Sequence, residues 1–249
     1  MARALGFSLF VLVLLALSTS VLARDAVPSE KIQAFAQPEL DASAFLPEPP
    51  AFDSVLFLQD RARYEQGRSL RGTTRALKAA EDANTKILPE LFSEAFGTSI
   101  SREQLPELYT LIQRVRKTVS SATHKLKRAY WRMRPFVLYG DETCYPAKEA
   151  SHKLQSSYPS GHSACGFAVA LLLSEINPGR ADKILARGVE YGQSRVICGY
   201  HWQSDVDVAR VLASALMAQL HANVEFQEAL ARAKDEYAKH VAEQADAKP

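Results

Sequence analysis

One stretch decides the fold of this chain: Ser160-Gly161-His162-Ser163-Ala164-Cys165-Gly166-Phe167-Ala168-Val169-Ala170-Leu171-Leu172-Leu173. It opens with a serine, a residue favoured as a helix N-cap, and its apolar run ends at Ser174-Glu175. Because the run is shorter than the roughly 20 residues that span a bilayer, it predicts a helix in a protein core rather than in a membrane.

Helical patterns extend on both sides of this stretch, where apolar residues recur at helical spacing behind helix-start signals. The first predicted helix carries Val55, Leu56, Leu58 and Ala62, and the second carries Leu77, Ala80 and Ala83 and ends near Pro89. A third helix follows a capping box at Ser101–Gln104 and carries Leu108, Leu111, Ile112 and Val115, and a fourth follows Asn177-Pro178 and carries Ile184, Leu185, Val189 and Tyr191. A fifth helix follows a capping-box pattern at Ser204–Asp207 and carries Val208, Val211, Leu212, Ala215 and Leu216, and a last helix starts at about Asn223. Since no alternating strand pattern or internal repeat is present, the sequence predicts an all-α single-domain helical bundle over residues 53–249.

Composition limits the class of protein. The chain has 249 residues, of which 47% are hydrophobic, enough to bury a core without disulfide staples. Its net charge of +2 lacks the excess of Lys and Arg typical of nucleic-acid binders, so we expect no nucleic-acid partner. The three cysteines lack Cys-x-x-Cys spacing, which argues against a structural zinc site.

The first residues predict a secretory signal peptide over residues 1–23. Arg3 precedes the apolar stretch Leu5–Leu17, and Val21-Leu22-Ala23 resembles a signal-peptidase site. An N-terminal membrane anchor is the alternative. No later segment is long enough to span a bilayer, so we expect a periplasmic protein with no membrane association after signal cleavage. Residues 24–52 are rich in proline and predict an arm that wraps the surface.

Export makes a disulfide chemically possible. Cys144, Cys165 and Cys198 allow three pairings, and each pairing leaves one thiol over. A Cys144–Cys198 bridge and three free, mostly buried thiols both stay open.

Three short segments carry candidate chemistry. In the first, Lys127–Pro135, Lys127 and Arg134 are seven residues apart, so two helical turns would bring both cations to one anion. Pro135 disfavours helical backbone at Arg134, which we therefore expect at the end of the helix. A solvated basic helix face is the alternative; it would comprise Lys125, Lys127, Arg128, Arg132 and Arg134.

The second segment is Ser156–Ser163. With Ser160 as N-cap, the backbone N–H groups of Gly161 and His162 lie at the positive end of the helix dipole, which favours an anion. His162 is then a candidate proton donor to a leaving oxygen. The alternative is an ordinary capped helix with an unrelated histidine.

The third segment is Ser194–Asp205. Arg195 adds a guanidinium that suits phosphate oxygens. His201 and Asp205 are four residues apart at a predicted helix start, so the carboxylate can fix one imidazole nitrogen and leave the other free as a nucleophile. The alternative makes Asp205 only a first-turn helix carboxylate and His201 a satisfied core residue.

Together the three segments resemble the signature of the type 2 phosphatidic acid phosphatase superfamily, which includes vanadate-dependent haloperoxidases. The matching pattern is Lys127-x6-Arg134-Pro135, Pro159-Ser160-Gly161-His162 and Ser194-Arg195-x5-His201-x3-Asp205. Residues 157–162 and 196–207 are most similar to the bacterial class A nonspecific acid phosphatases, and the likeness extends from about Leu46 through Tyr237. Ser156 stands where that class has Gly and Ser163 where it has Thr, which leaves substrate preference open.

The resemblance implies a helical fold of the acid phosphatase/vanadium-dependent haloperoxidase type that hydrolyses phosphate monoesters (nucleotides, aryl and sugar phosphates) without metal or other cofactor. It implies that His201 forms a phosphohistidine, that His162 protonates the leaving alcohol and then activates water, and that Asp205 orients His201. It assigns the phosphoryl oxygens to Lys127, Arg134, Ser160, Gly161 and Arg195. Phosphotransfer to an alcohol and homo-oligomers are also implied.

Three other functions compete with this one. A haloperoxidase would bind vanadate at His201 as a cofactor in the same pocket. A membrane lipid phosphatase would need a spanning helix, and a phosphate-binding module would not need the His201–Asp205 pair together with His162.

Overall fold

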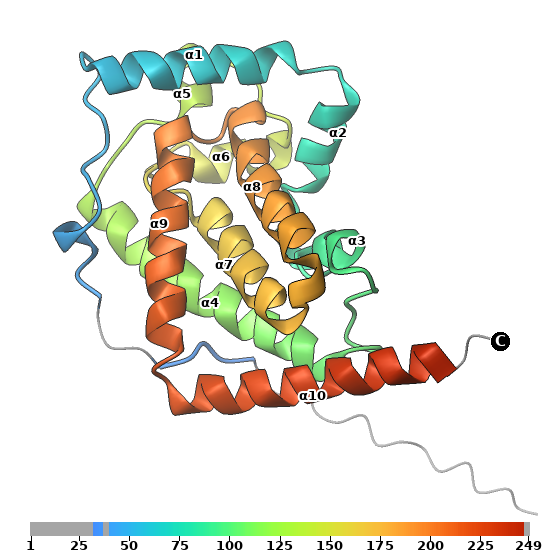
Figure 1. Ribbon diagram of the computed structural model, residues 1–249. Helices are drawn as coiled ribbons and strands as arrows, with labels where there is room; N and C mark the ends of the chain where they lie inside the picture. Colours follow the sequence, from blue (N-terminus) through green and yellow to red (C-terminus); the bar gives the residue numbers. More distant parts are fainter. Residues whose placement is uncertain (1–31, 37–39, 247–249) are drawn as a thin grey trace, which may run out of the picture. The chain divides into compact units, whose positions relative to one another are not determined.

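The computed structural model describes residues 32–36 and 40–246, and these form helices and connecting segments with no β-strand (Figure 1). The predicted signal peptide, residues 1–23, lies outside the described residues, as do residues 24–31 of the predicted arm. The all-α fold is confirmed. Its α-helices are α1 (Val55–Ser69), α2 (Thr74–Glu81), α3 (Ser93–Phe96), α4 (Pro106–Ala129), α5 (Pro135–Tyr139), α6 (Glu149–His152), α7 (Gly161–Ile176), α8 (Ala181–Ile197), α9 (Gln203–Leu220) and α10 (Val224–Asp246).

Short 3₁₀ turns punctuate the connections. They are η1 (Ala42–Ala44), η2 (Thr85–Ile87), η3 (Glu90–Phe92), η4 (Pro146–Lys148) and η5 (Pro178–Arg180). Within the described ranges, every helix is too short or too polar to cross a lipid bilayer.

Helix α7 is the central element and packs against α4, α8 and α9 (Figure 1). Ser160 caps its start, with Oγ accepting a hydrogen bond from the Ser163 N–H at 3.3 Å. Its buried residues, from Ser163 to Ile176, lie on all sides of the helix, as a helix enclosed by others requires. The predicted core helix is confirmed, and its capped start is the floor of the pocket described below.

Two glycines let α7 and α8 cross closely. A Cβ atom on Gly166 of α7 would lie 2.1 Å from Cδ1 of Tyr191 on α8. A Cβ atom on Gly188 of α8 would lie 2.5 Å from Cβ of Ala170 on α7. Both approaches are too short for any side chain, so each glycine sets the spacing of the two helices.

Several predicted helix boundaries are wrong. Asn177 and Pro178 begin the 3₁₀ turn η5, and helix α8 starts only after it, at Ala181. The Ser101 hydroxyl does accept from the Gln104 N–H, at 3.3 Å, but it caps only a turn. Helix α4 begins five residues later at Pro106, because proline suits the first helical position. Helix α2 ends at Glu81 rather than near Pro89, and the chain continues in the turns η2 and η3.

The predicted apolar face of α1 is also wrong. Val55 and Leu58 are 71% and 57% exposed, while Phe57, Asp60 and Tyr64 are buried. The buried face of α1 is therefore partly polar, because Asp60 forms an ion pair inside the protein. Hydrophobic periodicity cannot register a buried carboxylate.

The described part of the arm packs against the helices. The Phe35 N–H donates to Oγ1 of Thr118 on α4 at 2.9 Å, and the Arg114 guanidinium lies 3.8 Å from the centre of the Phe35 ring. Ala42 and Leu46 are buried, and the Tyr158 hydroxyl donates to the Pro47 carbonyl. The arm thus contributes to the core, while the boundary between arm and catalytic domain stays a prediction.

Cys144 and Cys198 form a disulfide, with their Cα atoms 4.7 Å apart, and Cys165 is a buried free thiol. This pairing was one of the alternatives that the sequence left open. It links the loop after α5 to the end of α8.

Candidate active site

A cavity of about 230 Å³ lies at the start of α7 and collects residues from separate parts of the chain. Six of the eight predicted site residues line it: Lys127, Arg134, Gly161, His162, Arg195 and His201. Ser160 and Asp205 are fully buried beside it: Ser160 precedes Gly161 in the chain, and Oδ2 of Asp205 lies 3.4 Å from Nδ1 of His201. All three segments of the sequence pattern therefore converge here.

Arg134 reaches the cavity by a different route from the one predicted. Helix α4 ends at Ala129, and Arg134 is the N-cap of α5 with extended backbone. Its guanidinium donates to four backbone carbonyls, those of His152, Gln155, Ser156 and Tyr200, at 3.0–3.1 Å. Lys127 and Arg134 are therefore brought to the same cavity by tertiary packing and not by two turns of one helix.

The other two cations have different surroundings. Lys127 Nζ donates to the carbonyls of Ser156 and Ser157 at 2.7 and 3.1 Å. Within the part of the chain that the structure describes, Nε and Nη1 of Arg195 are buried and have no hydrogen-bond partner. Since buried donors are nearly always paired in a working protein, these N–H groups mark a place for an anionic ligand.

The cavity concentrates positive charge. Burial, followed by repulsion from Arg134, holds the pKa of Lys127 well below its usual value. Burial lowers the pKa of Arg134 to about 10 and also lowers the pKa of Arg195. A bound dianion would relieve this repulsion, so the electrostatics favour a phosphate-like ligand. Among the described residues, no group of three or more His, Cys, Asp or Glu side chains could hold a metal ion.

The contacts of His201 define its tautomer. Its Nε2 lies 3.2 Å from Nη1 of Arg134, and a guanidinium can only donate, so Nε2 carries the lone pair and Nδ1 the hydrogen. Nδ1 lies 3.4 Å from Oδ2 of Asp205, a long contact whose geometry falls short of a hydrogen bond. Burial and then the charges of Arg134, Lys127 and Arg195 hold the pKa of His201 well below its usual value, so the imidazole is neutral.

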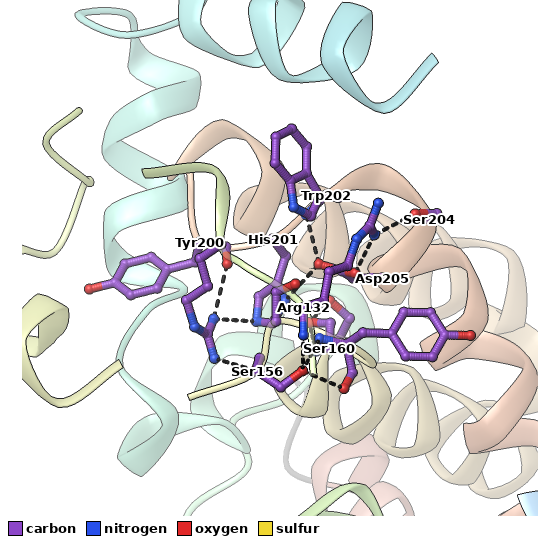
Figure 2. A network of polar contacts seen from close by, with 12 residues as sticks. Arg132, Ser156, Ser160, Tyr200, His201, Trp202, Ser204 and Asp205 are labelled. Atoms are coloured by element: carbon purple, nitrogen blue, oxygen red, sulfur yellow. Dashed lines mark hydrogen bonds and ion pairs between the residues drawn. The ribbon is translucent and has the colours of Figure 1, made fainter. Parts of the chain in front are cut away.

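Asp205 sits in the first turn of α9, where each of its oxygens has a partner. Oδ2 accepts from the Trp202 N–H at 2.9 Å, and Oδ1 accepts from Nη1 of Arg132 at 2.6 Å (Figure 2). The capping-box pattern predicted from Ser204 is therefore displaced: Trp202 is the N-cap, and the Ser204 hydroxyl donates to Asp60 instead. These two partners fix the orientation of the Asp205 carboxylate.

His162, the second histidine of the cavity, is held by a backbone carbonyl. Its ring stacks on Tyr191, with centroids 4.5 Å apart and planes 7° apart. Nε2 lies 2.6 Å from the carbonyl oxygen of Asp82, which can only accept, so Nε2 carries a hydrogen and, in the neutral ring, Nδ1 carries the lone pair. Burial and then the charge of Arg195 hold the pKa of His162 well below its usual value.

Ser160 and Gly161 shape the floor of the cavity. The Ser160 hydroxyl contacts the Ser163 hydroxyl at 2.8 Å, and its N–H donates to the Asp205 carbonyl at 3.0 Å. A Cβ atom on Gly161 would lie 2.9 Å from Oγ1 of Thr123, so α7 can start this close to α4 only with glycine. The first N–H groups of α7 have no partner within the helix, and a direct role of Ser160 toward phosphate stays a prediction.

Sequence reasoning missed the residues behind the two histidines. Arg132 was grouped with a solvated basic face, yet it is 3% exposed and paired with Asp60 and Asp205. Asp82 is fully buried, where it pairs with Arg187. No local pattern marks these carboxylates, because their partners are more than 70 residues away.

Comparisons with known proteins agree with this geometry. Residues 111–227 match the family model described as the PAP2 superfamily. The chain is 51% identical over 203 residues to a non-specific acid phosphatase of Providencia stuartii, covering 80% of this chain and 82% of the relative. It is 39% identical over 214 residues to a non-specific acid phosphatase of Salmonella typhimurium, covering 84% and 85%. The chain therefore belongs to the PAP2 superfamily, among its bacterial class A acid phosphatases.

Proposed function

We propose that this acid phosphatase hydrolyses phosphate monoesters in two steps, through a phosphohistidine on His201 and without a metal ion. The observation that carries the proposal is the geometry of His201: its Nε2 lies 3.2 Å from Nη1 of Arg134, at a cavity that Lys127 and Arg195 also line. Cations fixed before the reaction stabilise charge on a transferring phosphoryl group, which is the main demand of this chemistry.

In the first step, Nε2 of His201 attacks phosphorus in line with the ester oxygen. The P–N bond forms as the P–O bond to the alcohol breaks, and His162 supplies the proton that the leaving oxygen needs. The phosphorylated ring keeps its Nδ1 hydrogen and is therefore cationic, and Asp205, 3.4 Å from Nδ1, stabilises that charge until the P–N bond breaks and returns its electron pair to Nε2. Arg134, Lys127 and Arg195 hold the phosphoryl oxygens.

The protonation of His162 is coupled to substrate binding in this proposal. Burial and then the charge of Arg195 hold the pKa of His162 well below its usual value. A bound phosphate group offsets that charge and raises the pKa of His162, so the ring takes up a proton as the ester binds. An acidic optimum follows, because the acid His162 must be charged while the nucleophile His201 must be neutral.

In the second step, water attacks phosphorus and His162 removes its proton. The P–N bond breaks, inorganic phosphate leaves and His201 returns to its neutral state. An alcohol that enters in place of water would receive the phosphoryl group, so we expect phosphotransferase side activity. Nucleotides, aryl phosphates and sugar phosphates are the expected substrates, with the leaving group at the mouth of the cavity.

We further propose export to the periplasm and assembly into homo-oligomers. The Cys144–Cys198 disulfide supports export, because such bonds persist in oxidising compartments. Detection of the mature protein in a periplasmic fraction, with residues 1–23 removed, tests the first expectation. Light scattering of the purified protein tests the second.

The activity is tested by p-nitrophenyl phosphate hydrolysis between about pH 4 and pH 8 with excess EDTA, beside His201→Ala. The proposal predicts EDTA-resistant turnover with an acidic optimum that His201→Ala abolishes. Turnover that EDTA removes, or that survives in folded His201→Ala, contradicts it. Peroxidase activity with bromide and added vanadate, in the absence of phosphatase activity, would indicate the haloperoxidase function instead.

A further inference from the structure

A buried chain of charges runs from α1 to the catalytic histidine. Nη2 of Arg132 lies 2.7 Å from Oδ2 of Asp60, and Nη1 lies 2.6 Å from Oδ1 of Asp205. The three side chains are 3%, 2% and 0% exposed, in that order. Arg132 therefore joins two carboxylates whose helices, α1 and α9, are far apart in the sequence.

Ser204 locks this chain of charges in place. Its N–H donates to Oδ1 of Asp60 at 2.8 Å, and its hydroxyl donates to Oδ2 at 2.6 Å. The same hydroxyl oxygen accepts from Nη1 of Arg132 at 2.8 Å (Figure 2). Asp60 thus has both oxygens engaged, so the carboxylate that holds Arg132 cannot rotate without breaking hydrogen bonds.

The arrangement divides the two oxygens of Asp205 between two tasks. Arg132 occupies Oδ1, and Oδ2 accepts from the Trp202 N–H and faces Nδ1 of His201. If Arg132 were absent, Oδ1 would lose its cation and the carboxylate could turn about its Cβ–Cγ bond. The orientation of Oδ2 toward Nδ1 therefore depends on a residue that does not touch the imidazole.

We propose that Arg132 and Asp60 are positioning residues for phosphoryl transfer: Asp60 fixes Arg132, Arg132 fixes Asp205, and Asp205 presents one oxygen to His201. This inference rests on the proposed function, since it takes His201 as the nucleophile. Outer partners of this kind hold a reacting group within the tolerance that catalysis requires, and a misplacement of about 1 Å can cost about 100-fold in rate.

The charges of Asp60, Arg132 and Asp205 should affect the pH dependence of the reaction. Removing Arg132 leaves the negative charge of Asp205 less compensated, which favours the protonated form of His201. Removing the charge of Asp60 leaves Arg132 less compensated and disfavours that form. The other titratable or charged groups that face His201 are Lys127 on α4, Arg134 before α5, His152 on α6, His162 on α7 and Arg195 on α8, and none of them is changed by these two substitutions.

The test compares Arg132→Gln, Asp60→Asn and the double variant with the wild type, using p-nitrophenyl phosphate. We expect Arg132→Gln to lower kcat about 100-fold with KM within about threefold, because the lost interaction positions the nucleophile and does not bind substrate. We expect Asp60→Asn to lower kcat about tenfold. The double variant, which removes both charges, should match Arg132→Gln in kcat, because Asp60 acts through Arg132.

The acid limb of kcat/KM is the readout that a merely structural role would not move. It should shift upward by about half a pH unit in Arg132→Gln and downward in Asp60→Asn. Arg114→Gln is the matched control. It breaks the ion pair of Arg114 with Glu225, whose charged atoms lie 2.7 Å apart. Arg114 lies on α4, as Lys127 does, but outside the pocket. The control should retain its pH profile and its kcat per folded molecule.

Two results would overturn the inference. One is a folded Arg132→Gln protein with kcat within about threefold of the wild type. The other is a loss of kcat with an unshifted acid limb in both single variants. If Arg132→Gln does not fold, Asp60→Asn, which preserves shape, decides alone. His201→Ala measured beside them separates the two proposals: if it is inactive while Arg132→Gln is unaffected, only this inference fails, and if it is active, the nucleophile itself is wrong.

Discussion

The two histidines of the pocket are held by different kinds of acceptor. His201 faces the carboxylate of Asp205, which is backed by Arg132. His162 donates instead to the backbone carbonyl of Asp82 and stacks on Tyr191. The carboxylate of Asp82 pairs with Arg187 and accepts a hydrogen bond from the Ser194 hydroxyl at 2.6 Å.

This difference matches the two proposed roles. A phosphorylated imidazole carries positive charge, and a full negative charge nearby stabilises it. An acid that becomes a base must give up its proton readily, and a neutral carbonyl fixes the ring without strongly favouring the charged form. Asp205 is four residues from its histidine in the sequence, whereas the fold brings Asp82 to His162 from 80 residues away and presents its backbone carbonyl instead of its carboxylate.

The largest effect should separate the two aspartates. We expect Asp205→Asn to lower kcat by about 10³–10⁴-fold, as replacement of the carboxylate in a catalytic triad does, because the charge that faces Nδ1 is lost. Asp82→Asn leaves the backbone carbonyl in place, so its activity per folded molecule should stay within about tenfold. We expect Asp82→Asn to lower the free energy of unfolding by about 3 kcal/mol, because the substitution breaks a buried ion pair with Arg187.

Steady-state kinetics and chemical denaturation of the two variants check this comparison. Equal losses of kcat in both proteins would contradict it, because the side chain of Asp82 would then act on His162 as directly as that of Asp205 acts on His201.

A second effect should be specific to His162. In Gly166→Ala the new Cβ atom would lie 2.1 Å from the Tyr191 ring, which must shift and carry the stacked His162 with it. We expect kcat to fall about 10- to 100-fold, together with an overpacking cost of about 1–3 kcal/mol.

Gly188→Ala is the matched control for this variant. It overpacks the same pair of helices, at 2.5 Å from Ala170, without touching Tyr191. A similar loss of stability with kcat close to that of the wild type is expected. If both alanine variants lose kcat equally, the stacking of His162 on Tyr191 is not what positions the ring.

A third effect concerns both histidines together. Their pKa values are lowered in the folded, phosphate-free protein, so below about pH 6.5 the unfolded chain binds protons that the folded chain does not. The free energy of unfolding should therefore fall as the pH drops below that value. Inorganic phosphate at about 100 times its dissociation constant should add about 2.7 kcal/mol.

Thermal unfolding with and without phosphate, at several pH values, measures this. Phosphate binding should also take up protons, which calorimetry in buffers of different ionisation enthalpy detects. Proton release on binding would contradict the proposed coupling to His162.

The smallest effect should come from Ser156. Its hydroxyl donates to the Tyr130 carbonyl at 2.6 Å and accepts from the N–H groups of Arg132 and Tyr158 at 3.0 and 3.1 Å. Ser156→Gly should cost about 1–2 kcal/mol of stability, while kcat stays within about threefold, since the Ser156 carbonyl still accepts from Lys127 and Arg134. Ser156→Ala separates loss of the hydroxyl from the added flexibility of glycine, and a large change in KM in either variant would contradict this account.

Local signals predicted part of the fold well. Ser160 and the apolar run behind it predict α7, because a cap and a fully buried helix both show in adjacent residues. The start of α4 was misplaced because a serine can cap a turn as readily as a helix, and only Pro106 marks the true first turn. The buried face of α1 was missed because Asp60 is stabilised by Arg132, a partner that no local pattern includes.

Local signals likewise predicted some residues of the candidate site and missed others. His162, Arg195 and His201 follow from motif and chemistry, and the structure brings them to one cavity. Arg132 differs from the exposed basic residues around it only by its tertiary partners, so composition alone placed it on a solvated face. The residues that we propose to contact the phosphoryl group are thus easier to predict from the sequence than the residues that we propose to position them.

The most direct test of the central claim is to trap the covalent intermediate. Excess enzyme is mixed with a radiolabelled phosphate monoester, quenched in alkali within the first turnover, digested and mapped by mass spectrometry. The account predicts a phosphoryl group on the His201 ring, absent from His201→Ala and longer-lived in His162→Ala, because that variant lacks the base for the second step. Label on another residue, or full turnover with no label on His201 in either the wild type or His162→Ala, would contradict the account.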